Sequence, residues 1–243
     1  GFYVGPGTYR DPDGHLYIRL AKTIDLRAAE ARYGTVFATE NAAPSGYSIL
    51  LSDAAYALRI TGSYWTFQDL VIRQGQGTIS LGAGVHDLRF ERVTAWMGDR
   101  SIEAAEAGIH HVTVTQCRLY GDRPYWIFWS DMKDAPAPAD YARGTTIDLR
   151  AGAHDWEIAY SHVRGSGQDL LGTTDNEYNI VIHHNRFENA GDDGLELEGT
   201  VDVGRVEVYE NFFLNCLDAI APGQSTPMFT GPLLVYRNVV SLL

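Results

Sequence analysis

Seven stretches of this chain carry the same pattern of apolar residues at a regular spacing. Each stretch has apolar residues at its first, third and eighth positions, and successive stretches begin 23, 24, 44, 24, 26 and 27 residues apart. The stretches are WTFQDLVI (65–72), LRFERVTA (88–95), VTVTQCRL (112–119), WEIAYSHV (156–163), IVIHHNRF (180–187), VEVYENFF (206–213) and LLVYRNVV (233–240). A repeat of roughly 20–50 residues is typical of a solenoid, and alternation within each repeat indicates strands rather than helices.

A second set of alternating stretches lies upstream of most of these. Their second and fourth residues are mostly apolar, and TISL (78–81) and TIDL (146–149) match across two coils together with the residues that follow them. Each coil is therefore expected to contain three short strands joined by bends. The sequence predicts an all-β, single-stranded parallel β-helix of about seven coils, each of roughly 23–27 residues.

The sixth position of the repeat predicts how one bend is built. It is Asn185, Asn211 and Asn238 in the last three coils. A buried asparagine amide can hydrogen-bond to the asparagines above and below it and to the backbone of the bend. Asparagine also tolerates the left-handed backbone conformation that a sharp bend requires. We therefore expect these three side chains to stack inside the solenoid.

The first 45 residues fit none of these coils, and a solenoid must cover its open end. Residues 25–34 start with an aspartate at a capping position and end with a glycine, which predicts a short helix. We expect residues 1–47 to form an N-terminal cap with edge strands and residues 48–243 to form one continuous β-helix. Residues 121–144 are predicted to be a loop inserted between two coils.

Cysteine usage gives no evidence for a disulfide framework. Cys117 and Cys216 are the only cysteines, and they fall at different positions of different coils. We expect both to be free thiols.

The residues that carry these patterns resemble a known family. LRITGSYWTFQDLVI (58–72) and DDGLELEG (192–199), with the two coils that follow, are similar to the right-handed parallel β-helix repeats of the pectate-lyase-like superfamily. The resemblance covers roughly residues 48–243, and it implies a right-handed parallel β-helix with a short N-terminal capping segment. That superfamily contains lyases, hydrolases, epimerases and non-catalytic adhesins, so the fold alone does not select a function.

The charge of the chain narrows the class of partner. The formal net charge is −12, from 31 acidic and 19 basic residues. Nucleic acids and anionic membranes need a basic surface, and no apolar run is long enough to span a bilayer, so neither partner is expected. We expect a monomer that binds a polysaccharide or oligosaccharide, without an organic cofactor. Such a protein would be secreted, periplasmic or on the cell surface, with its signal peptide not in this chain.

Carboxylates gather on the outward side of the upstream strands. Glu103 and Asp148 occupy the same outward position on neighbouring coils, and Glu196 occupies it about two rungs from Asp148. Like charges stacked on rungs about 4.8 Å apart cost energy unless a cation binds, a proton is shared or an arginine intervenes. These three residues are therefore candidate calcium ligands, since calcium prefers oxygen ligands. The alternative is a solvated acidic surface.

The segment GDDG (191–194) lies where a variable loop meets the same strand. Asp192 and Asp193 resemble the aspartate pair of polygalacturonase-like β-helix hydrolases, although the GHG and RIK motifs of those enzymes are absent from the sequence. The alternative is an Asx turn, in which an aspartate accepts backbone N–H bonds. The candidate catalytic residues are those that can supply acid, base or charge on this surface. They are Asp148, Arg150, Asp169, Asp192, Asp193 and Glu196.

The inserted loop carries aromatic residues that could contact a sugar. Tyr125, Trp126 and Trp129 lie in the run YWIFW, in a loop expected to overhang the acidic surface. Aromatic faces stack on sugar rings, and loops often carry function. The alternative is a hydrophobic plug packed on the coil, because exposed aromatic side chains are unfavourable.

The resemblance and the acidic surface together favour a polysaccharide lyase that cleaves an acidic, uronate-containing glycan. Such an enzyme removes the proton α to a carboxylate and neutralises that carboxylate. A glycoside hydrolase with paired carboxylates is the second hypothesis. A non-catalytic glycan-binding or surface solenoid is the third.

Overall fold

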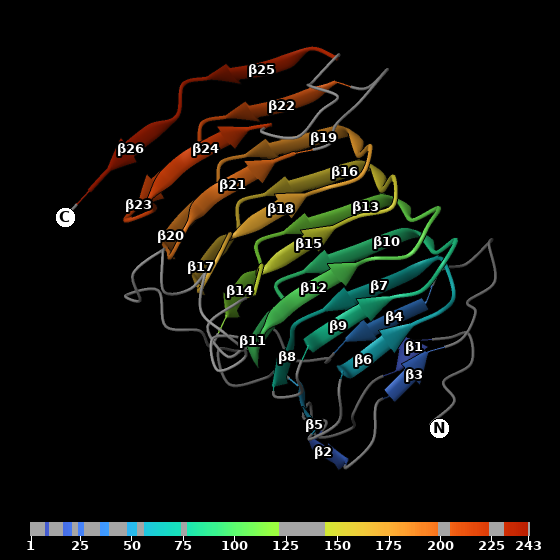
Figure 1. The fold of residues 1–243 in the computed structure, drawn as a ribbon. Helices are drawn as coiled ribbons and strands as arrows, with labels where there is room; N and C mark the ends of the chain where they lie inside the picture. The colour runs from blue at the N-terminus through green and yellow to red at the C-terminus, as the bar shows by residue number, and fades with distance from the viewer. Residues whose placement is uncertain are drawn as a thin grey trace, which may run out of the picture.

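The computed structural model describes the backbone of five strands before residue 56, and of residues 56–73, 77–121, 144–198, 205–223 and 231–242. Side-chain surroundings are described from residue 56 onward within these ranges, except at Arg73, Met97 and Gly98. Every regular element in the described part is a strand, and the strands form three parallel sheets along the molecule (Figure 1). The predicted all-β parallel β-helix is confirmed.

Each sheet takes one strand from each coil. The first sheet consists of β1 (Thr8–Tyr9), β4 (Thr35–Ala38), β7 (Trp65–Gln68), β10 (His86–Glu91), β13 (His110–Thr115), β16 (His154–Ala159), β19 (Tyr178–His183), β22 (Val206–Tyr209) and β25 (Leu233–Tyr236). The second sheet consists of β2 (Tyr17–Leu20), β5 (Ser48–Ser52), β8 (Leu70–Arg73), β11 (Thr94–Gly98), β14 (Arg118–Gly121), β17 (His162–Ser166), β20 (Arg186–Ala190), β23 (Phe212–Leu214) and β26 (Val239–Ser241). The third sheet consists of β3 (Ile24–Leu26), β6 (Tyr56–Ile60), β9 (Gly77–Leu81), β12 (Arg100–Ala104), β15 (Ile147–Leu149), β18 (Leu171–Thr173), β21 (Asp193–Leu197) and β24 (Asp218–Pro222).

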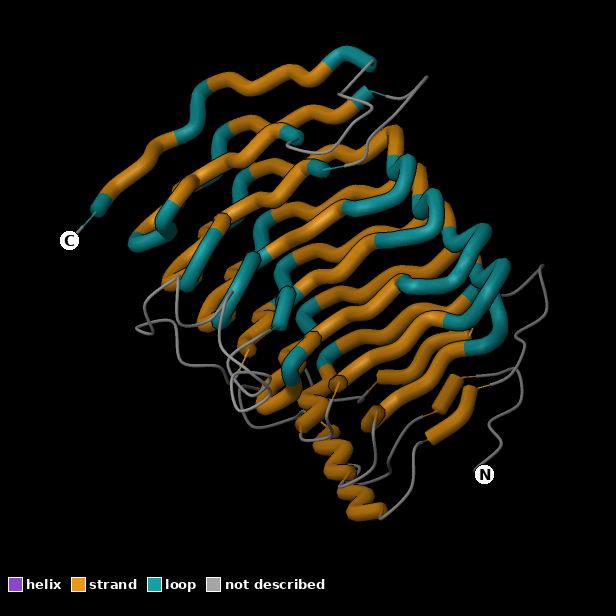
Figure 2. Tube along the Cα trace, viewed as in Figure 1, coloured by secondary structure: helices purple, strands orange, loops and turns teal. Residues whose placement is uncertain are grey.

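The strands of successive coils lie parallel to one another, and the loops of the described part that join them are short (Figure 2). The seven stretches of the repeat are the seven coils whose first-sheet strands run from β7 to β25. The register follows the repeat, since Leu88 pairs with Trp65 on one side and with Val112 on the other. The apolar alternation therefore sets both the strands and their alignment.

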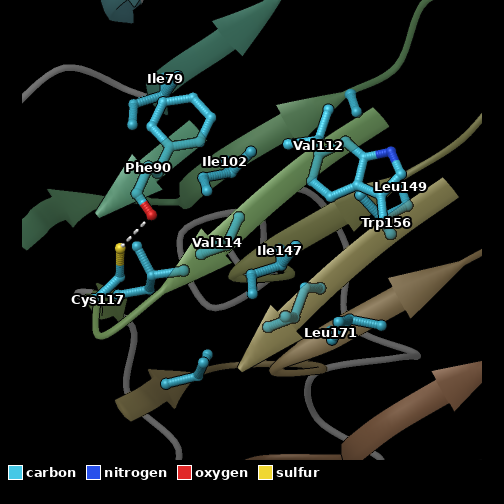
Figure 3. Close-up of a cluster of buried hydrophobic side chains, with 14 of the residues drawn as sticks. Ile79, Phe90, Ile102, Val112, Val114, Cys117, Ile147, Leu149, Trp156 and Leu171 are labelled. Carbon is cyan, nitrogen blue, oxygen red and sulfur yellow. Dashed lines mark hydrogen bonds between the residues drawn. The ribbon is translucent and has the colours of Figure 1, made fainter. Parts of the chain in front are cut away.

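The core lies between the three sheets. Apolar side chains at equivalent positions of successive coils stack in columns and fill it. Ile102 and Ile147 are paired and fully buried, and Phe90 stacks on the ring of Phe67 at 5.0 Å. Figure 3 shows part of this core, including the Cys117 Sγ–H that donates to the Phe90 carbonyl at 3.5 Å. Cys117 and Cys216 are buried free thiols, as predicted.

The bend between the first and second sheets contains the predicted asparagine ladder. Asn211 Nδ2 donates to Asn238 Oδ1 at 3.0 Å and to the Ile182 carbonyl at 2.9 Å, while its Oδ1 accepts from the backbone N–H of Asn185 at 2.9 Å. Asn185 Nδ2 also donates to Asn211 Oδ1 at 3.1 Å. Asn185 and Asn211 are buried, so the inward stack is confirmed.

The left-handed residue of this bend is not the asparagine but the residue before it. Positive φ angles occur there in seven successive coils, at Asp69, Arg92, Gln116, Tyr160, His184, Glu210 and Arg237. These residues come directly before the repeat position whose side chain points inward, and the sharp turn directs their own side chains outward. The asparagine instead stabilises the turn from inside through its amide.

The N-terminal segment contributes strands to all three sheets. Strands β1, β2 and β3 pair in parallel with β4, β5 and β6, so the three sheets continue through strands on both sides of residue 47. The helix predicted over 25–34 is wrong at its start, because β3 includes residues 25 and 26 and its pairing with β6 overrides local helix propensity. Residues 27–34 lie outside the described residues. In the described part, no helix is long and apolar enough to cross a membrane.

Candidate functional site

Three aspartates meet where the chain passes from the second sheet into the third. Asp193 is the first residue of β21, Asp192 precedes it, and Asp169 lies two residues before β18 on the neighbouring coil. One carboxylate oxygen from each residue lies within 4.8 Å of the other two. We call these three residues the aspartate cluster.

The glycines of GDDG allow this close approach. A Cβ atom at Gly194 would lie 2.6 Å from the Ala219 carbonyl oxygen and 2.8 Å from Phe213 Cδ1. A Cβ atom at Gly191 would collide with the Gly167 carbonyl of the preceding coil. Any side chain at either position would therefore push apart the coils that carry the aspartates.

The aspartate cluster is buried. The exposed fractions are 2% for Asp169, 7% for Asp192 and 6% for Asp193. Asp169 Oδ2 accepts from the Thr145 hydroxyl at 3.1 Å, and Oδ1 accepts from the Asp193 backbone N–H at 3.3 Å. Both donors are neutral, so they solvate the Asp169 carboxylate without neutralising it.

Burial raises the pKa of Asp169 to about 6, and the charges of Asp193 and Asp192 add to the shift. A hydrogen bond with the Glu196 side chain opposes it. Glu196 is partly exposed in β21, two rungs from Asp148. Near neutral pH this group of carboxyls therefore favours a shared proton or a bound cation.

The donor set fits a calcium ion. Calcium takes oxygen ligands at about 2.3–2.6 Å, so two ligand oxygens on opposite sides of one ion lie at most about 5 Å apart. The limit of 4.8 Å between oxygens of the aspartate cluster is compatible with ligands of one such ion. Asp169, Asp192 and Asp193 would hold the cation, with Glu196 beside them.

A second buried carboxylate on the same sheet is neutralised by protein groups. Asp148 in β15 is 2% exposed, and its Oδ2 accepts from Arg100 Nε at 2.9 Å while its Oδ1 accepts from Arg150 Nε at 2.8 Å. The hydrogen bond with Asp148 raises the pKa of Arg150, so Arg150 remains cationic. We call these three residues the arginine-paired site.

Glu103 extends the arginine-paired site toward β6. Arg100 Nη1 lies 3.3 Å from Glu103 Oε1, and the Tyr56 hydroxyl donates to Glu103 Oε2. Burial and this hydrogen bond raise the pKa of Tyr56 to about 12. Glu103 therefore has a cation and a hydroxyl as partners, in contrast to Asp169.

Comparison with known proteins identifies the architecture. No protein-family model matches the chain, and no curated protein matches it significantly. The crystal structure of pectate lyase Pel9A superposes with a TM-score of 0.65 and 15% sequence identity, over 97% of this chain and 60% of that chain. This likeness shows that the chain has the same kind of fold, a parallel β-helix. It spans about 60% of the length of the Pel9A chain that it matches.

Two further solved structures share less of this geometry. Alginate lyase from Paenibacillus sp. str. FPU-7 has a TM-score of 0.48 and 14% identity, over 93% of this chain and 92% of that chain. PfbA, a surface adhesin of Streptococcus pneumoniae, has a TM-score of 0.49 and 13% identity, over 99% of this chain and 72% of that chain. The likeness to Pel9A establishes a β-helix fold and no activity.

The structure divides the sequence-derived metal candidates between two places. Glu103 and Asp148 are neighbours in register, as expected. Gly172 separates Asp148 from Glu196, which lies beside the aspartate cluster instead. Of the catalytic candidates, Asp148 and Arg150 share one site, and Asp169, Asp192, Asp193 and Glu196 share the other.

The aromatic candidates Tyr125, Trp126 and Trp129 lie outside the described residues. Their role in substrate binding remains a prediction.

One coil is shifted by a residue relative to the sequence alignment. Aligned by its spacing with TIDL (146–149), the stretch DLLG (169–172) would place Leu170 beside Ile147, but Ile147 pairs with Leu171. Because Leu171 also pairs with Leu195, Asp169 falls directly beside Asp193 on the adjacent rung. Two consecutive leucines left the register ambiguous, and a one-residue slip changes which side chains meet.

Arg100 and Thr145 are functional candidates that the sequence pattern did not reveal. Because Ile102 points inward, strict alternation predicts that Arg100 points inward as well. Ser101 and Ile102 are instead both buried, which breaks the alternation, and Arg100 donates to Asp148. A buried aspartate requires a cation or donors, and that requirement was the available signal for Arg100.

Proposed function

We propose that this β-helix protein is a calcium-dependent polysaccharide lyase that cleaves a uronate-containing glycan. The observation that carries the proposal is the aspartate cluster, in which three buried carboxylates lie within 4.8 Å of one another. A cation there would also let a chain of net charge −12 bind an anionic polymer. Such polymers occur outside the cytoplasm, so we expect a secreted or cell-surface protein.

In this proposal the two carboxylate sites have different roles. A calcium ion, when bound, supplies positive charge that neutralises the uronate carboxylate and acidifies the adjacent C–H. Asp169, Asp192 and Asp193 would hold that ion. Arg150, kept protonated and oriented by Asp148, presents a fixed positive charge to a further carboxylate of the glycan.

We assign proton abstraction to Glu196. It is the partly exposed carboxylate beside the aspartate cluster. The elimination moves the proton at C5 to the Glu196 carboxylate, its electron pair forms the C4–C5 double bond, and the C4–O bond breaks. The leaving oxygen then takes a proton from solvent.

A retaining glycoside hydrolase is the second candidate. The pKa of about 6 for Asp169 suits a general acid. Inverting enzymes separate their carboxyl groups by about 6.5–9.5 Å to admit a water, whereas retaining enzymes separate them by about 5–5.5 Å. Carboxylate oxygens within 4.8 Å of one another are compatible with the closer, retaining arrangement. A non-catalytic glycan-binding solenoid is the third candidate.

The products of digestion separate these functions. Polygalacturonate, alginate and a neutral glycan are each incubated with the protein in calcium or in a chelator. The lyase proposal predicts ultraviolet absorbance from an unsaturated product, with an acidic glycan only, and no activity in chelator. Reducing ends without that absorbance would identify a hydrolase, and neither signal with retained binding would identify a binding protein.

Two substitutions assign roles within the site. Asp193→Asn should lower both calcium affinity and turnover by about 100-fold or more, since it removes a charged ligand. Glu196→Gln should lower kcat by a similar factor and leave the KM for the glycan within a few-fold. Asp218→Asn is the matched control, because Asp218 pairs with Asp193 on the next rung and is exposed. Equal activity of all three variants would exclude this site from catalysis.

A further inference from the structure

A groove of about 710 Å³ follows the bend between the first and second sheets, at a different corner of the β-helix from the aspartate cluster. Five successive coils line it, from Gln116–Arg118 to Arg237–Val239. Five rungs at about 4.8 Å give a length of roughly 19 Å along the helix axis. A groove of this shape suits an extended chain rather than a compact molecule.

The groove is basic on a strongly acidic protein. Arg118, Arg186 and Arg237 line it together with a single carboxylate, Glu210. All three arginines are exposed, and Arg118 has no ion pair with any residue that the structure describes. Glu210 is already bound to His184 at 2.7 Å and to Arg237 at 3.1 Å. Arg186 pairs through its Nε with Glu188 at 2.9 Å, and that contact does not use its two terminal nitrogens. The groove therefore offers the whole guanidinium group of Arg118 and the terminal nitrogens of Arg186 to an anion, while the chain as a whole carries −12.

Aromatic rings complete the groove. Tyr160 is 56% exposed and stacks on His184 with 4.7 Å between ring centroids, and Arg186 lies over the Phe212 ring at 5.3 Å. Tyr160 has a φ of 51°. Tyr160 occupies the bend position that has positive φ in all seven coils, and this bend geometry directs its ring outward. The bend thus presents a large ring to the groove.

We propose that this groove binds an acidic oligosaccharide independently of the aspartate cluster. Sugar rings stack on Tyr160, and carboxylates of successive sugars pair with Arg118 and Arg186, which lie on the same column two rungs apart. Binding here needs no metal ion, because the counter-charges are guanidinium groups. The inference goes beyond the proposed lyase, since it holds whether or not the aspartate cluster is catalytic.

The test uses calorimetric titration of the full chain with an oligogalacturonate of six sugars, in excess chelator. An Asp193→Asn background removes the contribution of the aspartate cluster. We expect measurable binding that Arg118→Gln/Arg186→Gln weakens at least 10-fold. Arg59→Gln/Arg89→Gln is the matched control, because both residues are about half exposed and lie outside the groove, and it should change affinity less than 2-fold. Tyr160→Asn, which keeps a residue that tolerates positive φ, should weaken binding several-fold without loss of melting temperature.

Three results would overturn the inference. These are no binding in chelator, equal weakening by the control pair, and equal affinity for a neutral hexasaccharide or for a single-stranded oligonucleotide. Loss of lyase activity in Asp193→Asn with unchanged binding in chelator would separate the two proposals, since the first concerns the aspartate cluster alone.

Discussion

Asp148 and Asp169 are two equally buried aspartates beside the same sheet, each with 2% of its surface exposed. Both oxygens of Asp148 accept hydrogen bonds from arginine side chains. Asp169 accepts from a hydroxyl and a backbone N–H, and its charged neighbours are the carboxyls of Asp193 and Asp192. One carboxylate is compensated within the fold, and the other is left to be compensated by a proton or a ligand.

The difference between Asp148 and Asp169 lies in how the cost of burying a charge is offset. Transferring a charged side chain from water into the protein interior costs several kcal/mol of free energy. A nearby opposite charge offsets that cost. Where the chain supplies the opposite charge, as at Asp148, the ion pair contributes to the folded state. Where it supplies more negative charge, as at Asp169, the unfavourable interaction is the feature expected of a binding or catalytic site.

The largest expected effect comes from removing the compensation at Asp148. Arg100→Met with Arg150→Met should lower the free energy of unfolding by about 3 kcal/mol, near the lower end of the range for broken buried pairs. The arginine side chains are 33% and 42% exposed, which limits the effect. Urea unfolding monitored by fluorescence measures it.

Arg89→Met provides the control for that experiment. Arg89 is 49% exposed and pairs with Glu91 on the outer surface, so the change should be less than about 1 kcal/mol. A double variant as stable as Arg89→Met would show that Asp148 does not depend on its arginines.

The asparagine ladder extends the comparison to neutral polar groups. Asn211→Leu should lower the free energy of unfolding by about 1–3 kcal/mol, because it strands the Ile182 carbonyl and the buried amide of Asn185. The same change at the half-buried Asn238 should cost less. Equal costs at both positions would contradict a stack that is strongest inside the solenoid.

A smaller effect, of opposite sign, is expected at Asp169. The pKa of Asp169 is raised to about 6 by burial and by Asp193 and Asp192, so the folded state holds a proton that the unfolded state releases. Stability contributed by this proton is present at low pH and is lost as pH rises from about 4 through 6. In chelator, Asp169→Asn should therefore be about as stable as the wild type at pH 4 and more stable at pH 7.

The difference between wild type and Asp169→Asn is the quantity to measure. Burial also raises the pKa of Glu177 to about 7, which gives the wild type and the variant the same additional pH dependence. Melting curves at pH 4, 5, 6 and 7 provide the comparison. A constant difference across that range would contradict a raised pKa at Asp169.

The sequence predicted the parts of the fold that repeat. Alternation identified the strands around Trp65 and Ile180, and the shared sixth position identified the stack of Asn211 and Asn238. These predictions were confirmed because equivalent residues of each coil pack in the same way, so the pattern recurs along the sequence. Edge strands were expected before residue 48, but their places in the three sheets were not, since their pairing with later coils depends on contacts distant in sequence.

The site was predicted less completely, because it occurs once rather than in every coil. Asp192, Asp193 and Asp169 were all identified as candidates, but the two leucines at 170 and 171 concealed the register that places Asp169 beside Asp193. Arg100 was missed because buried residues at 101 and 102 interrupt the alternation. Both errors arise where the chain enters the third sheet, where the two-residue period does not hold.

Calcium titration tests the central claim most directly. Isothermal titration of calcium into protein stripped of metal should give one binding site in the wild type and in Glu103→Gln, whose carboxylate is held by Arg100 and Tyr56. Asp193→Asn should lower the calcium affinity by about 100-fold or more. Calcium at 100 times its Kd should also stabilise the wild type by about 2.7 kcal/mol. Absence of binding in the wild type, or loss of binding in Glu103→Gln but not in Asp193→Asn, would contradict the assignment of the metal site to Asp169, Asp192 and Asp193.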